Sequence, residues 1–399
     1  MNVWDGHARL EGELAPETVA EDACLSRCSR TCLGCSIAGV KLVTTGRNAA
    51  THNPSRSAPI DETRLLPVLT VVPWLSMGLL LVGWLLFPAT LTGVMYLPLL
   101  LSVVLLGLPH GALDHLVPTR LGWPWAQRLR PVLLYNLAYA ALSALLLLMW
   151  PTLPVLAFWV FLVVSLLHWG QGDLHFLEAS LGRARAGWWS APLTVIARGS
   201  LPILVPLLVF PDWFQRLLTG AASVFGADAP KTLLPGVWST WLTALLILAL
   251  TAYLLDTFSS SPRALLELGE VGLLLLLFTT VPPPLAIGSY FTLWHSWRHL
   301  GRLRALFDPT GGSGSAVGTM RIEQFALLFV PITLLALLLL GGLYAWAAPR
   351  IHDLERFAAL YLALIAALTG PHALLVALMD FKSVGSAAAP KSAPAAPTR

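Results

Sequence analysis

The sequence predicts an all-α fold, a polytopic transmembrane helix bundle with about eight to ten membrane helices. Of its 399 residues, 56% are hydrophobic and only 12% are charged, whereas soluble domains carry about 25% charged residues. The mean hydropathy is +0.72. Apolar stretches of roughly 20 residues recur, and each could cross about 30 Å of hydrocarbon as a helix. The lipid bilayer is therefore the expected environment. The net charge of +4 gives no sign of a nucleic-acid partner.

Residues 1–63 are polar and rich in Ala, Ser, Thr and Arg, which predicts a disordered cytoplasmic extension. The segment has no basic stretch followed by an apolar one, so it does not resemble a secretory signal peptide. It contains all four cysteines, Cys24, Cys28, Cys32 and Cys35. Their C-x3-C-x2-C spacing is that of a radical-SAM cluster site, but so short a segment cannot supply the barrel which that chemistry needs. A chance cluster in a tail, or an over-extended start, is favoured over a small metal site.

Ten apolar helices are expected from residue 65 onward, within a transmembrane catalytic domain at residues 64–381. Pro282, Pro283 and Pro284 should separate the seventh helix from the eighth, because consecutive prolines cannot continue a helix. The GGSGS stretch at 311–315 predicts a flexible loop, and the Ala/Pro/Ser-rich residues 382–399 a disordered tail. The expected helices are 65–87, 91–117, 131–150, 153–176, 190–210, 235–256, 265–281, 285–305, 321–347 and 355–380.

The positive charges predict the orientation of these helices. Loops after the even-numbered helices carry Lys or Arg, whereas the loops after helices 1, 3 and 7 carry none. Those after helices 5 and 9 carry a few that acidic residues offset. Because basic loops stay in the cytoplasm, both termini are expected there. The basic residues that follow the even-numbered helices are Arg120, Arg128, Arg130, Arg183, Arg185, Arg263, Arg302, Arg304 and Lys382.

Seven of the ten histidines lie in or beside apolar segments, and they fall on helices 2, 4, 8 and 10. All four helices run from outside to inside in the expected topology, with each histidine in the later half. The seven therefore share one depth zone near the cytoplasmic side. Ionisable residues inside a membrane are costly and normally face the bundle interior in functional or paired roles, so the coincidence predicts a shared metal site. These residues are His110, His115, His168, His175, His295, His299 and His372.

The spacing of these residues supports a metal site. His295 and His299 are four residues apart, so they project from one helical face and could hold one ion. Asp114 follows His110 by four residues and could orient a ligand imidazole by accepting its second N–H. His168 and His175 are about 10 Å apart along a helix, too far to share an ion. His115 should point away from His110.

The available ligands are imidazoles and carboxylates, with no thiol in the membrane part. They suit iron, zinc or copper and argue against an iron–sulfur cluster. Neutral histidines with open coordination positions are compatible with O2 activation on ferrous iron. Gly107, Gly111, Gly170 and Gly172 would allow neighbouring backbones or a bulky ligand to approach closely.

Four other classes of membrane protein remain in competition. A lipid desaturase or hydroxylase with histidine boxes usually has paired HH motifs, and this chain has none. A zinc intramembrane protease would need HExxH, and no Glu follows any membrane histidine. A b-type cytochrome stays compatible with the spacing, and a Soret band would reveal it. A transporter would predict internal inverted repeats, which the sequence does not show.

Four motifs in order, PHGALDH, HWGQGD, WHSWRH and PH, resemble the Brp/Blh family of β-carotene 15,15′-dioxygenases. The resemblance covers roughly residues 66–380. It implies an inner-membrane enzyme that cleaves the central double bond of β-carotene with O2 into two all-trans-retinal molecules, which supply microbial rhodopsins. It also implies one Fe2+ held by four histidines, which correspond to His110, His168, His295 and His299 here. His372 matches the last motif and is a lower-ranked candidate.

The resemblance also suggests roles for residues near these motifs. Asp114 and Asp173 would orient ligand histidines, while His115 and His175 rank below them. Arg298 is expected to anchor the cytoplasmic interface. A β-carotene site should open laterally to lipid, and aromatic side chains could line its tunnel, although packing in the core or at the membrane interface is the favoured explanation for each of them. The aromatic candidates are Trp169, Tyr290, Trp294 and Trp297.

Overall fold

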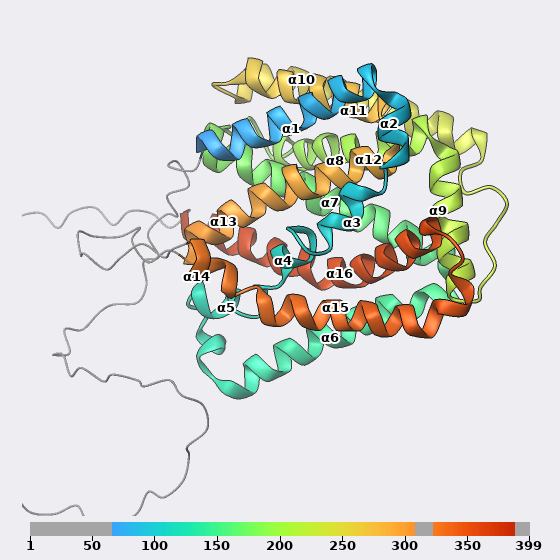
Figure 1. Ribbon diagram of the computed structural model, residues 1–399. Coiled ribbons are helices and arrows are strands. Elements are labelled where there is room, and N and C mark those ends of the chain that lie inside the picture. The colour runs from blue at the N-terminus through green and yellow to red at the C-terminus, as the bar shows by residue number, and fades with distance from the viewer. Residues whose placement is uncertain (1–65, 308–321, 388–399) are drawn as a thin grey trace, which may run out of the picture. The chain divides into compact units, whose positions relative to one another are not determined.

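The computed structural model describes residues 66–307 and 322–387, with side chains described to residue 381 (Figure 1). The described residues form helices and no strand, which confirms the all-α prediction. The four cysteines, the GGSGS loop and most of the expected tail lie outside these ranges. Seven described helices are long and apolar enough to cross a membrane, which confirms the transmembrane class. They are Leu66–Leu86, Leu129–Thr152, Pro154–Leu181, Ser190–Val209, Gly236–Ser260, Ile322–Arg350 and Leu354–Phe381.

The long helices match most of the expected segments. The expected helices at 265–281 and 285–305 are present but do not count among the seven. The first has only 17 residues, and the second is interrupted by a π-helical turn. An amphipathic helix, α9 (Pro211–Val224), is an addition that the hydropathy pattern did not indicate. The long helices are α1 (Leu66–Leu86), α6 (Leu129–Thr152), α7 (Pro154–Leu181), α8 (Ser190–Val209), α10 (Gly236–Ser260), α11 (Ala264–Thr280), α15 (Val330–Ala347, after α14 at Ile322–Leu327 and before η5 at Ala348–Arg350) and α16 (Leu354–Ala387).

The single helix expected at 91–117 is wrong, because the chain there breaks into short pieces. Prolines begin several of them, and proline cannot donate the backbone hydrogen bond that a helix interior needs. A β-carbon at Gly107 would come within 2.6 Å of the Ser102 carbonyl oxygen and 2.7 Å of the Phe291 ring, so the chain turns there against another helix. The pieces are α2 (Pro88–Gly93), α3 (Leu97–Ser102), α4 (Gly107–Gly111), α5 (Val117–Arg120) and η2 (Pro124–Gln127).

The expected break at the consecutive prolines is confirmed. Helix α11 ends at Thr280, and α12 (Pro283–Tyr290) starts within the proline run. It continues through a π-helical turn, η3 (Phe291–Ser296), into α13 (Trp297–Phe307). A π turn adds a residue to one helical turn and often occurs at functional sites. His295 lies on this π turn, and His299 follows it on α13.

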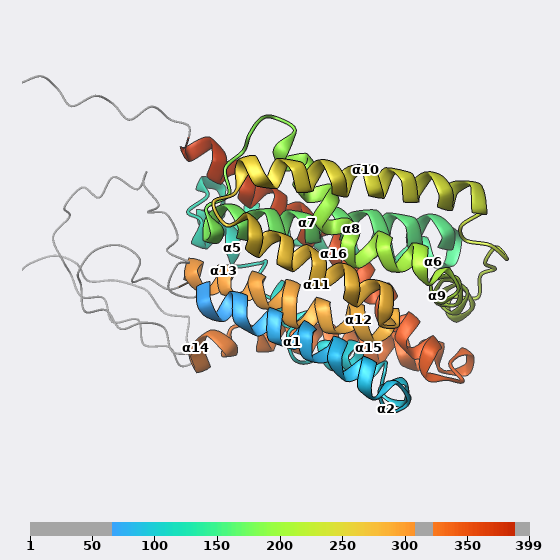
Figure 2. The same cartoon turned by 90° about the horizontal axis from the view of Figure 1, so that it is seen from above.

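Helices α7 and α16 lie inside the bundle, whereas α1, α6, α10 and α15 present mostly exposed apolar side chains. In Figure 1, α10 lies on one side and α6 and α15 on the other, with α7 and α16 between them; Figure 2 shows the same helices from above. Helix α7 packs closely on α8, because a β-carbon at Gly170 or Gly199 would meet the facing backbone at 1.9 Å. The inner helices thus bring polar residues to the centre while the outer ones face lipid.

Candidate metal centre

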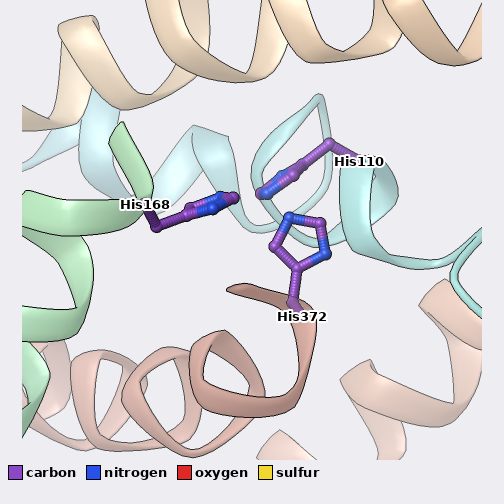
Figure 3. A group of neighbouring side chains, drawn as sticks. All are labelled: His110, His168 and His372. Atoms are coloured by element: carbon purple, nitrogen blue, oxygen red, sulfur yellow. The ribbon is translucent and has the colours of Figure 1, made fainter. Parts of the chain in front are cut away.

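Five histidines from four separate segments converge in the interior of the bundle. Each side chain is buried, with 2–7% of its surface exposed. Figure 3 shows three of these rings, from α4, α7 and α16, pointing toward a common space. The structure therefore brings together five of the seven histidines that the sequence singled out. They are His110 on α4, His168 on α7, His295 on η3, His299 on α13 and His372 on α16.

The rings are as close as ligands of one ion would be. Nε2 of His168 lies 3.1 Å from Nε2 of His295, and nitrogens bound at about 2.1 Å to a single ion lie roughly 3 Å apart. The ring centroids of His110 and His372 are 4.9 Å apart, and those of His299 and His372 are 5.2 Å apart. His110, His168 and His372 each offer a nitrogen within 4.8 Å of the others.

Three ring nitrogens in this cluster have no hydrogen-bond partner within the described part of the chain. They are Nδ1 of His168, Nε2 of His299 and Nε2 of His372, all buried. Buried polar atoms are normally hydrogen-bonded, and a bound ion would account for these three unpaired nitrogens. The donor set, the burial and the free nitrogens together fit a transition-metal ion with imidazole ligands.

Hydrogen bonds fix the orientation of two of these rings. Nδ1 of His372 donates to the Asp114 carboxylate at 2.8 Å, and the Tyr139 hydroxyl donates to the same oxygen at 2.9 Å. Nδ1 of His110 lies 3.2 Å from the Leu106 carbonyl oxygen and 3.2 Å from the Ser296 hydroxyl. In both rings Nε2 remains available, which is the usual arrangement around a protein-bound metal.

Asp114 therefore orients a different histidine from the one its spacing indicated. The four-residue separation from His110 implied a shared helical face, but α4 ends at Gly111. Beyond that residue the helical periodicity no longer applies, and the Asp114 side chain turns toward α16. Tyr139 of α6 was not identified from the sequence, because nothing in the local pattern links it to a residue 25 positions earlier.

We expect Asp114→Asn to weaken metal binding about 10- to 100-fold, the usual effect of removing such an outer carboxylate. The substitution keeps the size of the side chain but removes the charge that holds Nδ1–H of His372. Metal content of the purified protein after dialysis against a graded chelator series would measure the effect. Asp212→Asn is the matched control, because Asp212 is exposed on α9. Equal metal retention by both variants would contradict the assigned role of Asp114.

The two lower-ranked histidines lie outside the cluster. His175 is half-buried, with Nδ1 3.7 Å from Oδ1 of Asp380. Nδ1 of His115 lies 2.9 Å from the Ala112 carbonyl oxygen. These positions agree with the expected separation of His175 from His168 and of His115 from His110.

A buried ion-pair network lies beside the cluster and accounts for Asp173 and Arg298. Arg298 contacts Asp173 at 3.1 Å and Glu270 at 2.5 Å, and Arg198 contacts the same two carboxylates. The Trp294 indole donates to Asp173 at 3.1 Å. Arg298 is only 6% exposed, so the expectation that it anchors the membrane interface is wrong. Asp173 pairs with two guanidinium groups and does not orient a ligand imidazole, contrary to the expectation.

Arg198 and Glu270 were missed in the sequence, although a signal was present. Each is a charged residue within an expected apolar helix, and intramembrane charges are rare and usually paired. Their partners could not be identified without the fold, since the hydrogen-bonded atoms of Arg198 and Glu270 belong to residues 72 positions apart.

One cavity is lined by histidines, and a second lies behind Trp169 and Phe291. The first, here called the histidine cavity, has a volume of about 440 Å³, within the roughly 300–1,000 Å³ of small-molecule sites. The second, here called the apolar cavity, has about 90 Å³. The histidine cavity is lined by residues that include His110, His115, Tyr139, Ala144, Leu335 and His372. The apolar cavity is lined by residues that include Leu162, Trp169, Trp213, Ile287, Phe291 and Leu362.

Only one of the four aromatic candidates lines either cavity. Trp169 lines the apolar cavity, with its ring centroid 5.7 Å from that of His295. Tyr290 and Trp294 stack on each other behind it, at 5.9 Å, beside the ion-pair network. The Trp297 indole donates to the Val68 carbonyl at 3.3 Å on the outside of α13. Phe291, which the sequence did not single out, lines both cavities.

The fold and site define an integral membrane protein whose helices converge on a buried histidine cluster fit for a transition metal. A profile of the family described as beta-carotene 15,15′-dioxygenase matches residues 101–380. The chain belongs to this family.

Curated relatives agree with the family match. The chain is similar to the probable beta-carotene 15,15′-dioxygenase Blh of Halobacterium salinarum, with 35% identity over 327 residues, 77% of this chain and 92% of that protein. It is also 24% identical over 302 residues to the beta-carotene 15,15′-dioxygenase of an uncultured marine bacterium, covering 75% of this chain and 94% of that one. The probable dioxygenase Brp of Halobacterium salinarum is 26% identical over 55% of this chain and 62% of its own length. No solved structure matches the chain.

Proposed function

We propose that the protein cleaves the 15,15′ double bond of β-carotene with O2 to give two molecules of all-trans-retinal. The observation that carries the proposal is the group of five buried histidines, three of which have an unpartnered ring nitrogen. A cavity that two of the five line and a second, apolar cavity lie beside this group. The family match and the names of the relatives supply the substrate. They favour carotenoid cleavage over lipid desaturation.

We further propose that the metal is Fe2+. His110, His168, His295 and His299 would hold it, and the free Nε2 of His372 makes that residue a fifth candidate. A ferrous ion with imidazole ligands and open positions would supply the binding and activation of O2. Asp114 and Tyr139 hold His372 in one orientation, and the surrounding apolar helices exclude water from the reacting centre.

The reaction balances without any other reactant. The C15–C15′ double bond breaks, and each carbon receives one oxygen atom of O2 as an aldehyde. No proton or external reductant is consumed, so no acid or base residue is required. The burial of the site suits such a reaction, because water is neither a substrate nor a product.

The remaining assignments belong to the same proposal. The protein would lie in the inner cell membrane with both termini in the cytoplasm, because the basic loops follow the even-numbered expected helices. β-Carotene would reach the site from the bilayer, and the retinal would supply a microbial rhodopsin.

Expression in a β-carotene-producing bacterial host tests the activity. We expect the orange colour to fade and retinal to accumulate, with two retinals formed for each carotene consumed. An optical spectrum of the purified protein should show no Soret band, which distinguishes non-haem iron from haem. Unchanged carotene in the presence of folded, iron-containing protein would overturn the proposed function.

A further inference from the structure

The histidine cavity and the apolar cavity share a wall beside the histidine cluster. Phe291 on η3 and Ile365 on α16 line both of them. The Phe291 ring centroid is 5.5 Å from that of His110 and 6.4 Å from that of His295. The junction between the cavities is thus in contact with the residues assigned to the metal.

The histidine cavity opens toward lipid between α6 and α15. Its wall there is formed by Ala140 and Ala144 on α6 and by Leu335 and Leu339 on α15. All four side chains are exposed on the outer surface of the bundle; Leu335 is 52% and Leu339 is 50% exposed. The two alanines leave room between the helices, so an apolar molecule dissolved in the bilayer could enter sideways.

The apolar cavity continues from the junction along α16, away from His372. It follows this helix from Ile365 to Glu355, a length of about 15 Å at the helical rise per residue. Trp213 and Glu355 line its far end. Arg216 stacks over the Trp213 ring at 4.1 Å and pairs with Glu355 at 3.4 Å. The cavity is therefore a narrow apolar branch with a polar and aromatic end.

We infer that β-carotene enters between α6 and α15, crosses the histidine cavity, and places its leading arm past Phe291 and Ile365 along the apolar cavity. The side chains that line this cavity move apart to take the arm, because about 90 Å³ is too small for it. The length of that cavity and the charged pair at its far end limit how far the apolar rod advances, and so determine which double bond lies at the histidines. This inference rests on the proposed function. It assigns Leu362 and Ile287 to substrate positioning and Leu335 to substrate access.

Adding volume within the apolar cavity tests the positioning role. We expect Leu362→Trp to lower kcat/KM for β-carotene by at least about tenfold, because a small misplacement of the reacting bond is costly. Activity on β-apo-8′-carotenal, which is shortened at one end, should change less than about twofold, since its short arm can occupy the filled cavity. Any residual cut of β-carotene should move off the centre and yield two unequal apocarotenals.

Leu374→Trp is the matched control for this experiment. Leu374 lies on the same helix, is 55% exposed, and faces away from both cavities. Each variant is compared at equal bound iron, which separates positioning from loss of the metal site. A similar loss on both substrates, or full central cleavage of β-carotene by Leu362→Trp, would overturn the positioning role.

The lipid opening is tested on α15. Leu335→Trp should raise KM for β-carotene in vesicles about tenfold with little change in kcat, because it obstructs access and not the reacting geometry. Leu338→Trp, one turn on and 74% exposed, faces lipid outside the cavity and should match the parent. Identical kinetics for the two variants would refute access between α6 and α15. A parent protein that holds iron but forms no retinal would overturn the proposed function itself, before any variant is compared.

Discussion

Replacement of His168 by alanine is expected to abolish retinal formation and to remove most of the bound iron. His168 is the ring whose Nε2 lies 3.1 Å from that of His295, and its Nδ1 has no partner. Because it is a proposed ligand, its loss would open one side of the coordination shell, and a metal site depends on its full complement of ligands. Iron measured by plasma emission on detergent-purified protein, together with retinal by chromatography, would record both effects.

The matched control is His352→Ala, because His352 is exposed outside the bundle interior. It should keep both iron and activity. His110→Ala, His295→Ala and His299→Ala should behave like His168→Ala, and each is compared on the monodisperse fraction so that unfolded protein is excluded. A variant that retains its full iron content would remove that histidine from the ligand set.

The largest effect on stability is expected from Arg298→Met. Arg298 and Arg198 neutralise Asp173 and Glu270, and all four side chains are at most 4% exposed. Removal of one guanidinium leaves an uncompensated buried carboxylate, which costs about 3–5 kcal/mol. The thermal unfolding midpoint in detergent should fall accordingly.

Two comparisons make this result specific. Arg185→Met breaks a pair with Glu178 whose side chains are 43% and 26% exposed, so it should cost less than about 1 kcal/mol. The double variant Arg298→Met with Glu270→Gln removes one charge of each sign and should recover part of the loss. A midpoint for Arg298→Met equal to that for Arg185→Met would show that the network does not stabilise the fold.

The fold class and the meeting of the histidines could be predicted because both depend on patterns along the chain. Apolar length identifies a membrane helix, and loop charge gives its direction. Four histidine-bearing segments with the same predicted direction and depth are then expected to come together, because polar groups avoid lipid. His110, His168, His295 and His372 meet for this reason.

The parts that could not be predicted depend on contacts between distant segments. The apolar run at 91–117 has the hydropathy of one helix, but its prolines and its turn at Gly107 break it. Asp114 consequently meets His372, 258 residues away. The partners of Arg198 and Glu270 likewise follow from how α7, α8, α11 and α13 pack, which no local spacing encodes.

The π turn at Phe291–Ser296 carries a consequence for how this site could be lost. It accommodates one residue more than an ordinary turn, and it sets the angular position of Arg298 and His299 relative to the chain before it. Winding of the same six residues as a regular α-helix, after a substitution that favours it, would leave the hydropathy profile almost unchanged. It would also rotate everything that follows by about 100°, carrying the imidazole and the guanidinium away from their partners. A chain could therefore keep every histidine, insert into the membrane normally, and still have no site.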